Sequence, residues 1–166
     1  VPIAKDETGG TLFDKLAEAG AKLLVETLPH IFDGTAVYEK QPEESPTPYA
    51  GMITKQMGLI NFGKSAEELE RLVRGLNPWP SAFTFWNGKT LKVWESFVVK
   101  SEETGAEKPE PGTVVKTDKK GIYVACGEDV LVLSQVQLEG KKRMDADAFL
   151  RGCHIETGSR FTDKKE

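Results

Sequence analysis

Basic side chains recur at the turns of the second half of the chain, and clustered cations are the groups that contact nucleic-acid phosphates. Lysines follow the Asn87-Gly88 pair of a predicted hairpin, stand together in a later turn and form a triplet with Arg143. A single lysine in a turn usually serves solubility alone. Their repetition instead favours a phosphate-contacting face. The candidates are Lys55, Lys89, Lys92, Lys119, Lys120, Lys141, Lys142, Arg143 and Arg151.

Aromatic residues are concentrated between Arg74 and Trp94, a stretch that holds all three tryptophans. Exposed aromatic side chains on strands can stack on the bases of single-stranded RNA. Trp79 stands between two prolines, whereas Trp86 and Trp94 belong to segments joined by the tight Asn-Gly turn. We expect at least two of the three to pack in the core, with Trp79 as a wedge at a junction.

No stretch carries a strong catalytic or metal-binding motif. Gly9-Gly10 is an isolated pair and not a phosphate loop, and the spacing G-x-S-x-G is absent. The two cysteines and two histidines do not share a metal-ligand spacing. We therefore expect no catalytic residue and no metal ligand in this chain. Cys126 and Cys153 are interpreted as free thiols, with a disulfide between them as the alternative.

Composition indicates a globular chain that can bury a core. Its 166 residues are 39% hydrophobic and 29% charged, and no apolar run approaches the ~20 residues of a membrane span. The net charge of −4 lies in residues 1–86, with 8 Lys and Arg against 12 Asp and Glu, while residues 87–166 balance at 14 against 14. No secretory signal is visible, so we expect a cytoplasmic protein. The first residue is not Met, and we expect a fragment or processed product.

The first half reads as two helices separated by an irregular segment. Residues 1–36 predict a strand stub and then a helix, capped by Thr11 with Asp14 and closed by Asp33-Gly34 after Pro29. Leucines at helical spacing give this helix one apolar face. Residues 37–64 include the proline-rich "QPEESPTP" and predict a linker followed by a short strand or ordered loop.

A second helix and a run of short strands follow. Ser65 and Glu68 form a capping box, and the helix is expected to stop at Gly75 before Asn77-Pro78. Alternating residues around the Asn-Gly pair predict a hairpin, with Lys92 on the opposite face from Leu91 and Val93. Further strands are predicted at 113–117, 122–126 and 130–138, then a short helix capped by Asp145. The fold class is α+β, mainly a small antiparallel barrel or sandwich preceded by helices.

The stretch "SAEELERLVRGLNPWPSAFTFWNGKTLKVWES" closely resembles the domain junction of methionyl-tRNA formyltransferases. "PIAKDETGGTLFDKLAEAGAKLLVETL" is similar to the end of that family's formyltransferase domain. "YAGMITKQMGLINF" is similar to its interdomain segment. "PGTVV", "GIYVACGEDVLVLSQVQLEGKKRM" and "FLRG" resemble its C-terminal barrel. The similarity covers nearly the whole chain in the family's order.

The resemblance implies a role in formylating the methionine on initiator tRNA, with formyltetrahydrofolate as co-substrate. It implies that residues 1–41 end a doubly wound α/β formyltransferase domain, that 42–64 are the linker, and that 65–166 form the junction helix and an OB-like tRNA-binding barrel. Asn77, Pro78, Trp79 and Pro80 would form the domain junction. The catalytic Asn, His and Asp and the folate pocket belong to the part of the family that this chain lacks.

The resemblance therefore implies an inactive chain that binds initiator methionyl-tRNA, from a parent enzyme that is monomeric and not membrane-bound. Without its sheet, the helix in residues 1–36 is expected to expose its apolar face. Two other interpretations stay open: a free-standing OB-like RNA-binding module, and a formyltransferase acting on a nucleotide sugar. The NPWP junction and the KKRM end argue against the latter.

Overall fold

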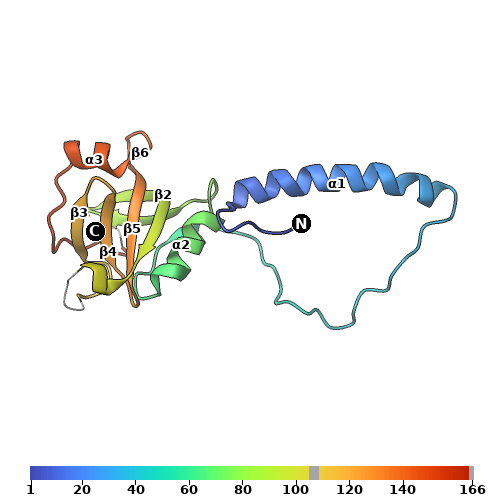
Figure 1. Ribbon diagram of the computed structural model, residues 1–166, viewed down its shortest axis with the longest axis horizontal. Helices are drawn as coiled ribbons and strands as arrows, with labels where there is room; N and C mark the ends of the chain where they lie inside the picture. Colours follow the sequence, from blue (N-terminus) through green and yellow to red (C-terminus); the bar gives the residue numbers. More distant parts are fainter. Residues whose placement is uncertain (105–108, 165–166) are drawn as a thin grey trace.

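The computed structural model describes residues 1–104 and 109–164, in which a long helix projects from a unit built on a β-sheet (Figure 1). The helices are α1 (Gly9–Phe32), α2 (Ala66–Gly75) and α3 (Ala146–Gly152), with 3₁₀ turns η1 (Lys55–Gly58) and η2 (Ser101–Thr104). The strands are β1 (Ala82–Trp86), β2 (Lys89–Val99), β3 (Val114–Asp118), β4 (Gly121–Ala125), β5 (Val130–Leu138) and β6 (Met144–Asp145).

The strands form one antiparallel sheet in the order β1-β2-β5-β4-β3, with β6 added to β5. The five longer strands confirm the sequence prediction to within a few residues, whereas the two-residue β6 was not predicted. Asn87 and Gly88 adopt positive φ angles of 47° and 69°, as a two-residue hairpin turn requires. In the resulting register Leu91 and Val93 are buried and Lys92 points outward, as predicted.

The sheet is open, so the prediction of a closed barrel is corrected. The edge strands β1 and β3 do not pair with each other. Instead, the segment after α3 is hydrogen-bonded to both edges. Phe85 and Thr162 exchange two backbone hydrogen bonds of 3.1 Å, and Val114 bonds Ser159 and Gly158 at 2.8 Å. An irregular segment thus occupies the place that a closing strand pair would take in a barrel.

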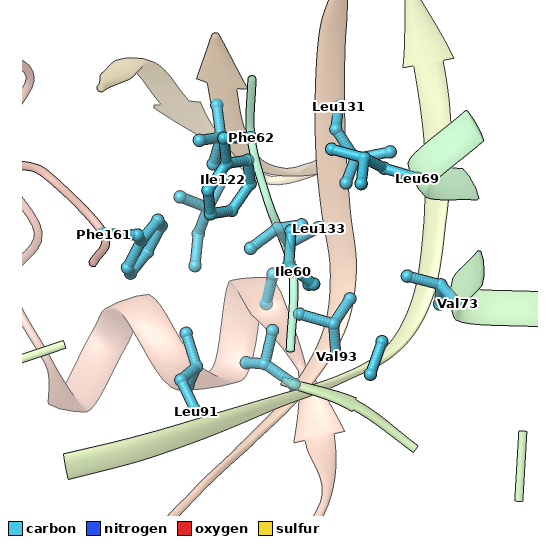
Figure 2. Close-up of a cluster of buried hydrophobic side chains, with 14 of the residues drawn as sticks. Ile60, Phe62, Leu69, Val73, Leu91, Val93, Ile122, Leu131, Leu133 and Phe161 are labelled. Atoms are coloured by element: carbon cyan, nitrogen blue, oxygen red, sulfur yellow. The ribbon is translucent and has the colours of Figure 1, made fainter. Parts of the chain in front are cut away.

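The core lies between the inner face of the sheet, α2 and the chain segments on either side (Figure 2). Leu91, Leu131 and Leu133 are fully buried, and Leu69 and Val73 of α2 point into the same cluster. Phe62 and Phe161 stack with ring centroids 6.2 Å apart. Burial alternates along β2 as strand periodicity requires, whereas Val130 and Val132 of β5 are also buried and belong to a second cluster with Tyr123.

Helix α2 confirms its predicted start and end. Ser65 accepts a hydrogen bond from the Glu68 backbone, and Glu68 accepts one from the backbone of Ser65. The hydrogen bonds that the Glu68 carboxyl accepts from the backbone and then the hydroxyl of Ser65 lower its pKa. Asp145 stands at the N-cap of α3, but its side chain makes no capping bond. It accepts a hydrogen bond from Gln135 at 3.0 Å, so the predicted cap is correct in position only.

Helix α1 differs from the prediction at its start, whereas its close at Asp33-Gly34 is confirmed. No strand precedes it in the described chain, and its capping box pairs Thr8 with Thr11, not Thr11 with Asp14. Pro29 lies inside the helix, which continues to Phe32. None of its residues is buried, and Phe13, Leu23 and Val25 are each more than 60% exposed. The expected exposure of an apolar face on this helix is confirmed.

The connection from α1 to the sheet unit is irregular, as predicted. Residues 33–54 contain no helix or strand and are almost entirely exposed. The expected strand or ordered loop after it is the turn η1, followed by a single bridge between Leu59 and Phe83.

Among the described residues, no helix has the length and apolarity needed to cross a membrane. Cys126 and Cys153 are unlinked, and burial raises the pKa of the Cys126 thiol to about 11.

A buried carboxylate secures the chain just before α1. Glu7 is 6% exposed and contacts the Lys15 ammonium and the Thr11 hydroxyl. Hydrogen bonds from Lys15 first, and then from Thr11, lower the pKa of Glu7 to about 2. Because the ordinary value is 4.5, the stabilisation is complete above that pH and is lost as the pH falls toward 2.

This contact predicts a titration that can be measured directly. The ¹³C shift of the Glu7 carboxyl should titrate with a midpoint near 2, and Lys15→Gln should move the midpoint toward 4.5. Lys22→Gln is the matched control, because Lys22 lies on the same helix but faces Glu26. A wild-type midpoint near 4.5 would contradict the assigned contact.

Candidate nucleic-acid interface

Three tight turns point toward the same end of the sheet and carry most of the candidate lysines. The register places the β1–β2 turn beside the end of β5, and the β3–β4 and β5–β6 turns extend in the same direction. We call this set the lysine end, defined by Lys89, Lys119, Lys120, Lys141 and Lys142. Lysines of different turns are 21 to 53 residues apart in sequence, and only antiparallel pairing brings their turns together.

The lysine end differs from the opposite end of the sheet in its ion pairing. None of its five lysines forms an ion pair with a described residue. At the opposite end, Lys100 lies 2.8 Å from Asp129 and Lys64 lies 3.5 Å from Glu68. The hydrogen bond to Asp129 raises the pKa of Lys100. Lysines without a protein carboxylate remain available to an external anion.

Nearby carboxylates have partners of their own. Asp118 lies 2.8 Å from Lys116 and accepts a 3.1 Å hydrogen bond from the Tyr123 hydroxyl. The bond to Asp118 raises the pKa of Lys116. Glu95 lies 3.1 Å from Arg143. These pairs reduce the negative field that Asp118 and Glu95 would otherwise exert beside the lysine end.

Trp94 connects the β5–β6 turn to the sheet. Its indole N–H donates to Gln137 at 3.1 Å, and the Gln137 amide donates to the Lys141 carbonyl at 2.9 Å. Lys92 and Arg143 lie over the Trp94 ring, at 5.6 and 4.8 Å from the centroid. The turn that carries the basic triplet is therefore fixed by side chains of β2 and β5. The alternating "SQVQL" of β5 was the signal that could have identified Gln137.

Two candidates lie apart from this group or are already paired. Lys55 belongs to η1, which runs alongside the start of β1 and away from the lysine end. Arg151 pairs with Asp147 within α3, beside β6 (Figure 1). Sequence reasoning overlooked Phe83 and Phe85, half-buried rings of β1 that lie 5.7 Å apart. Phe83 pairs with Lys92 in the strand register, so aromatic and basic side chains adjoin on this face.

The tryptophans do not behave as expected. In the described chain, Trp86 alone among them packs against the core, with its ring 6.2 Å from Phe149. Trp79 is 58% exposed, so its side chain does not pack in the core of this chain. The peptide bonds before Pro78 and Pro80 are both cis. Within the NPWP element, Asn77 makes the junction contact, because its amide donates to the Trp94 carbonyl at 3.1 Å.

The part of the chain that holds this sheet matches a known protein family. A family model described as "Formyl transferase, C-terminal domain" matches residues 52–154, which include the sheet, α2 and α3. The chain belongs to the formyl transferase C-terminal domain family. The matched region contains the lysine end, Trp94 and the NPWP element. The exposed helix α1 precedes the matched region.

Curated relatives extend the similarity of this formyl transferase C-terminal domain protein across α1. It is 54% identical to a methionyl-tRNA formyltransferase of Agathobacter rectalis, over 98% of this chain and 51% of the relative. It is 46% identical to one of Bacillus subtilis, over 95% of this chain and 49% of the relative. The chain thus spans about half the length of the curated relatives it matches.

Solved structures share the fold of this formyl transferase C-terminal domain protein at low sequence identity. A variant of HypX from Aquifex aeolicus matches with a TM-score of 0.60 and 14% identity, over 96% of this chain and 29% of that chain. HypX in complex with tetrahydrofolic acid matches with a TM-score of 0.54 and 12% identity, over 78% of this chain and 22% of that chain. These matches establish the fold alone.

Proposed function

We propose that this chain is the tRNA-binding part of a methionyl-tRNA formyltransferase, which formylates the methionine on initiator tRNA in the cytoplasm. The relatives that match almost the whole chain carry that enzyme's name. Formyltetrahydrofolate is the co-substrate of the parent enzyme. Formyl transfer itself takes place in a domain outside this chain, so the chain alone is inactive.

The observation that carries the proposal is the set of lysines without ion pairs in the described structure at one end of the sheet. Such lysines bind phosphate with release of condensed counterions, which gives affinity without base specificity. Phe83 and Phe85 beside Lys92 add aromatic surface for an unpaired base. An OB-type arrangement, with the tail between the sheet edges, is the fold we assign to this RNA-binding unit.

The parent enzyme supplies the remaining parts. Residues 1–41 end its doubly wound formyltransferase domain, 42–64 form the linker, and 65–166 form the junction and tRNA-binding unit. The exposed apolar face of α1 packs on the sheet of the formyltransferase domain in the parent. The parent acts as a monomer.

The proposal is tested by titrating fluorescently labelled initiator tRNA with this chain at several salt concentrations. If all five lysines of the lysine end contact phosphates, log affinity should fall with log salt at a slope of about −4.5. Affinity should then fall about 500-fold between 50 and 200 mM salt.

Elongator tRNA and an unrelated hairpin RNA of equal length are the competitors. Equal affinity for all three RNAs would favour the free-standing RNA-binding module. An affinity that does not change with salt concentration, or no binding at 50 mM salt, would contradict both interpretations.

A further inference from the structure

The first turn of α1 is seated directly on the end of α2. No residue of α1 is buried, so packing along the helix does not fix its direction. Two glycines instead allow close backbone contact. A Cβ at Gly9 would lie 2.3 Å from the Gly75 carbonyl oxygen, and one at Gly10 would lie 2.8 Å from Pro78 Cδ. The isolated Gly9-Gly10 pair therefore has a structural reason: a larger residue would force the helix away from its seat.

Polar contacts hold the same turn. The Gly10 N–H donates to the Asn77 carbonyl at 2.9 Å, which satisfies one of the free donors at the helix start. Arg74 Nη1 donates to the Glu7 carbonyl at 2.9 Å, across 67 residues of sequence. Glu70 holds the same guanidinium at 2.8 and 3.2 Å and raises the pKa of Arg74. The guanidinium is thus oriented before it reaches the α1 segment.

Asn77 joins this seat to the sheet. Its carbonyl accepts from Gly10, and its side-chain amide donates to the Trp94 carbonyl at 3.1 Å. The side chain of Trp94 in turn contacts Gln137, Lys92 and Arg143. A short, continuous set of contacts therefore runs from the start of α1 to the turn that carries Lys141 and Lys142.

We propose that Gly9, Gly10, Arg74 and Asn77 are positioning residues that fix the direction of α1 relative to the lysine end. The inference rests on the proposed function, in which α1 belongs to the formyltransferase domain. These residues then set the angle at which tRNA held by the lysine end reaches that domain.

The proposal predicts a measurable movement of α1. Relieving the clash of a Gly9 Cβ requires a displacement of about 1 Å over the 5.4 Å first turn, a tilt of about 10°. Glu26 lies 17 residues further along, about 26 Å, so it should move by about 5 Å. Spin labels at Glu26→Cys and Lys119→Cys, in a Cys153→Ser background, report this distance by pulsed electron paramagnetic resonance.

The spin-labelled chain with Gly9 and Arg74 intact should give one narrow distance distribution. Gly9→Ala should shift or broaden it, whereas Gly20→Ala should not, because no atom of the described residues lies within 4 Å of a Cβ at Gly20. Arg74→Met should broaden it, whereas Arg71→Met should not, because the ion pair of Arg71 in the described structure is with Glu67 of the same helix. The unfolding midpoint of the sheet and the affinity for tRNA, both measured in unlabelled chains that keep Lys119, should stay unchanged in all four variants.

A broad distribution before substitution would overturn the proposal. The proposal would also be overturned if the distance distributions of Gly9→Ala and Arg74→Met both matched those of their controls. If Gly9→Ala does not fold, Arg74→Met with Arg71→Met decides the question alone. Because no RNA is present during the distance measurement, failure of tRNA binding would leave this result intact, and the two proposals fail separately.

Discussion

Replacing Lys89, Lys141 and Lys142 with glutamate is expected to weaken binding of initiator tRNA by about 100- to 500-fold at about 0.1 M salt. Each lysine that contacts a phosphate contributes about 0.9 to the slope of log affinity against log salt. Three contacts therefore account for about 2.7 log units between 1 M and 0.1 M salt. The slope itself should fall from about −4.5 to about −1.8, which anisotropy titrations can resolve.

A control with equal charge separates local contacts from long-range repulsion. Lys5→Glu with Lys22→Glu and Lys40→Glu makes the same change in net charge, at exposed positions before the sheet unit. We expect this variant to lose much less affinity and to keep the wild-type salt slope. Equal losses in the two triple variants would show that the lysine end makes no direct phosphate contacts.

Leu133→Ala is expected to lower the free energy of unfolding of the sheet unit by about 2–5 kcal/mol. Leu133 is fully buried in the middle of β5 and pairs with Ser96 of β2 and Ile122 of β4. Its side chain lies at the centre of the cluster in Figure 2, where backbone on both sides limits collapse of the cavity. A loss of this size corresponds to a decrease of about 6–15 °C in the melting temperature.

Leu23→Ala provides the matched control for this substitution. Leu23 lies on α1 and is 63% exposed, so its removal should change stability by less than about 0.5 kcal/mol. Urea unfolding followed by tryptophan fluorescence gives both values, since Trp86 packs against the core. A Leu133→Ala variant as stable as Leu23→Ala would show that the core is not organised around β5.

The strands were predictable because their signals are local. The Asn87-Gly88 turn and the alternation on either side depend on residues within a few positions of one another. Closure was not predictable in this way. Whether β1 meets β3 depends on Phe85, Val114 and the tail at Thr162, which come together only in the folded chain. The predicted barrel was therefore right in its strands and wrong in its closure.

The candidate site was predictable in residue type and not in arrangement. Turn lysines were visible in the sequence, but Arg143 pairs with Glu95 across 48 residues, and Lys55 lies on another part of the sheet. The tryptophan-rich stretch was the conspicuous feature of the sequence, but other residues hold the start of α1. Trp79 is exposed, whereas the less conspicuous Gly9, Gly10 and Asn77 make the contacts between the start of α1 and the end of α2.

By itself, the sequence determined the second helix, the five longer strands, the hairpin turn and the family resemblance, because periodicity, caps and turns depend on near neighbours. The tertiary structure decided which lysines lack a carboxylate partner among the described residues, which tryptophan packs in the core, and where α1 is seated. Those outcomes depend on side chains and backbone brought together from 40 to 70 residues apart, such as Arg74 and Glu7 or Trp94 and Gln137.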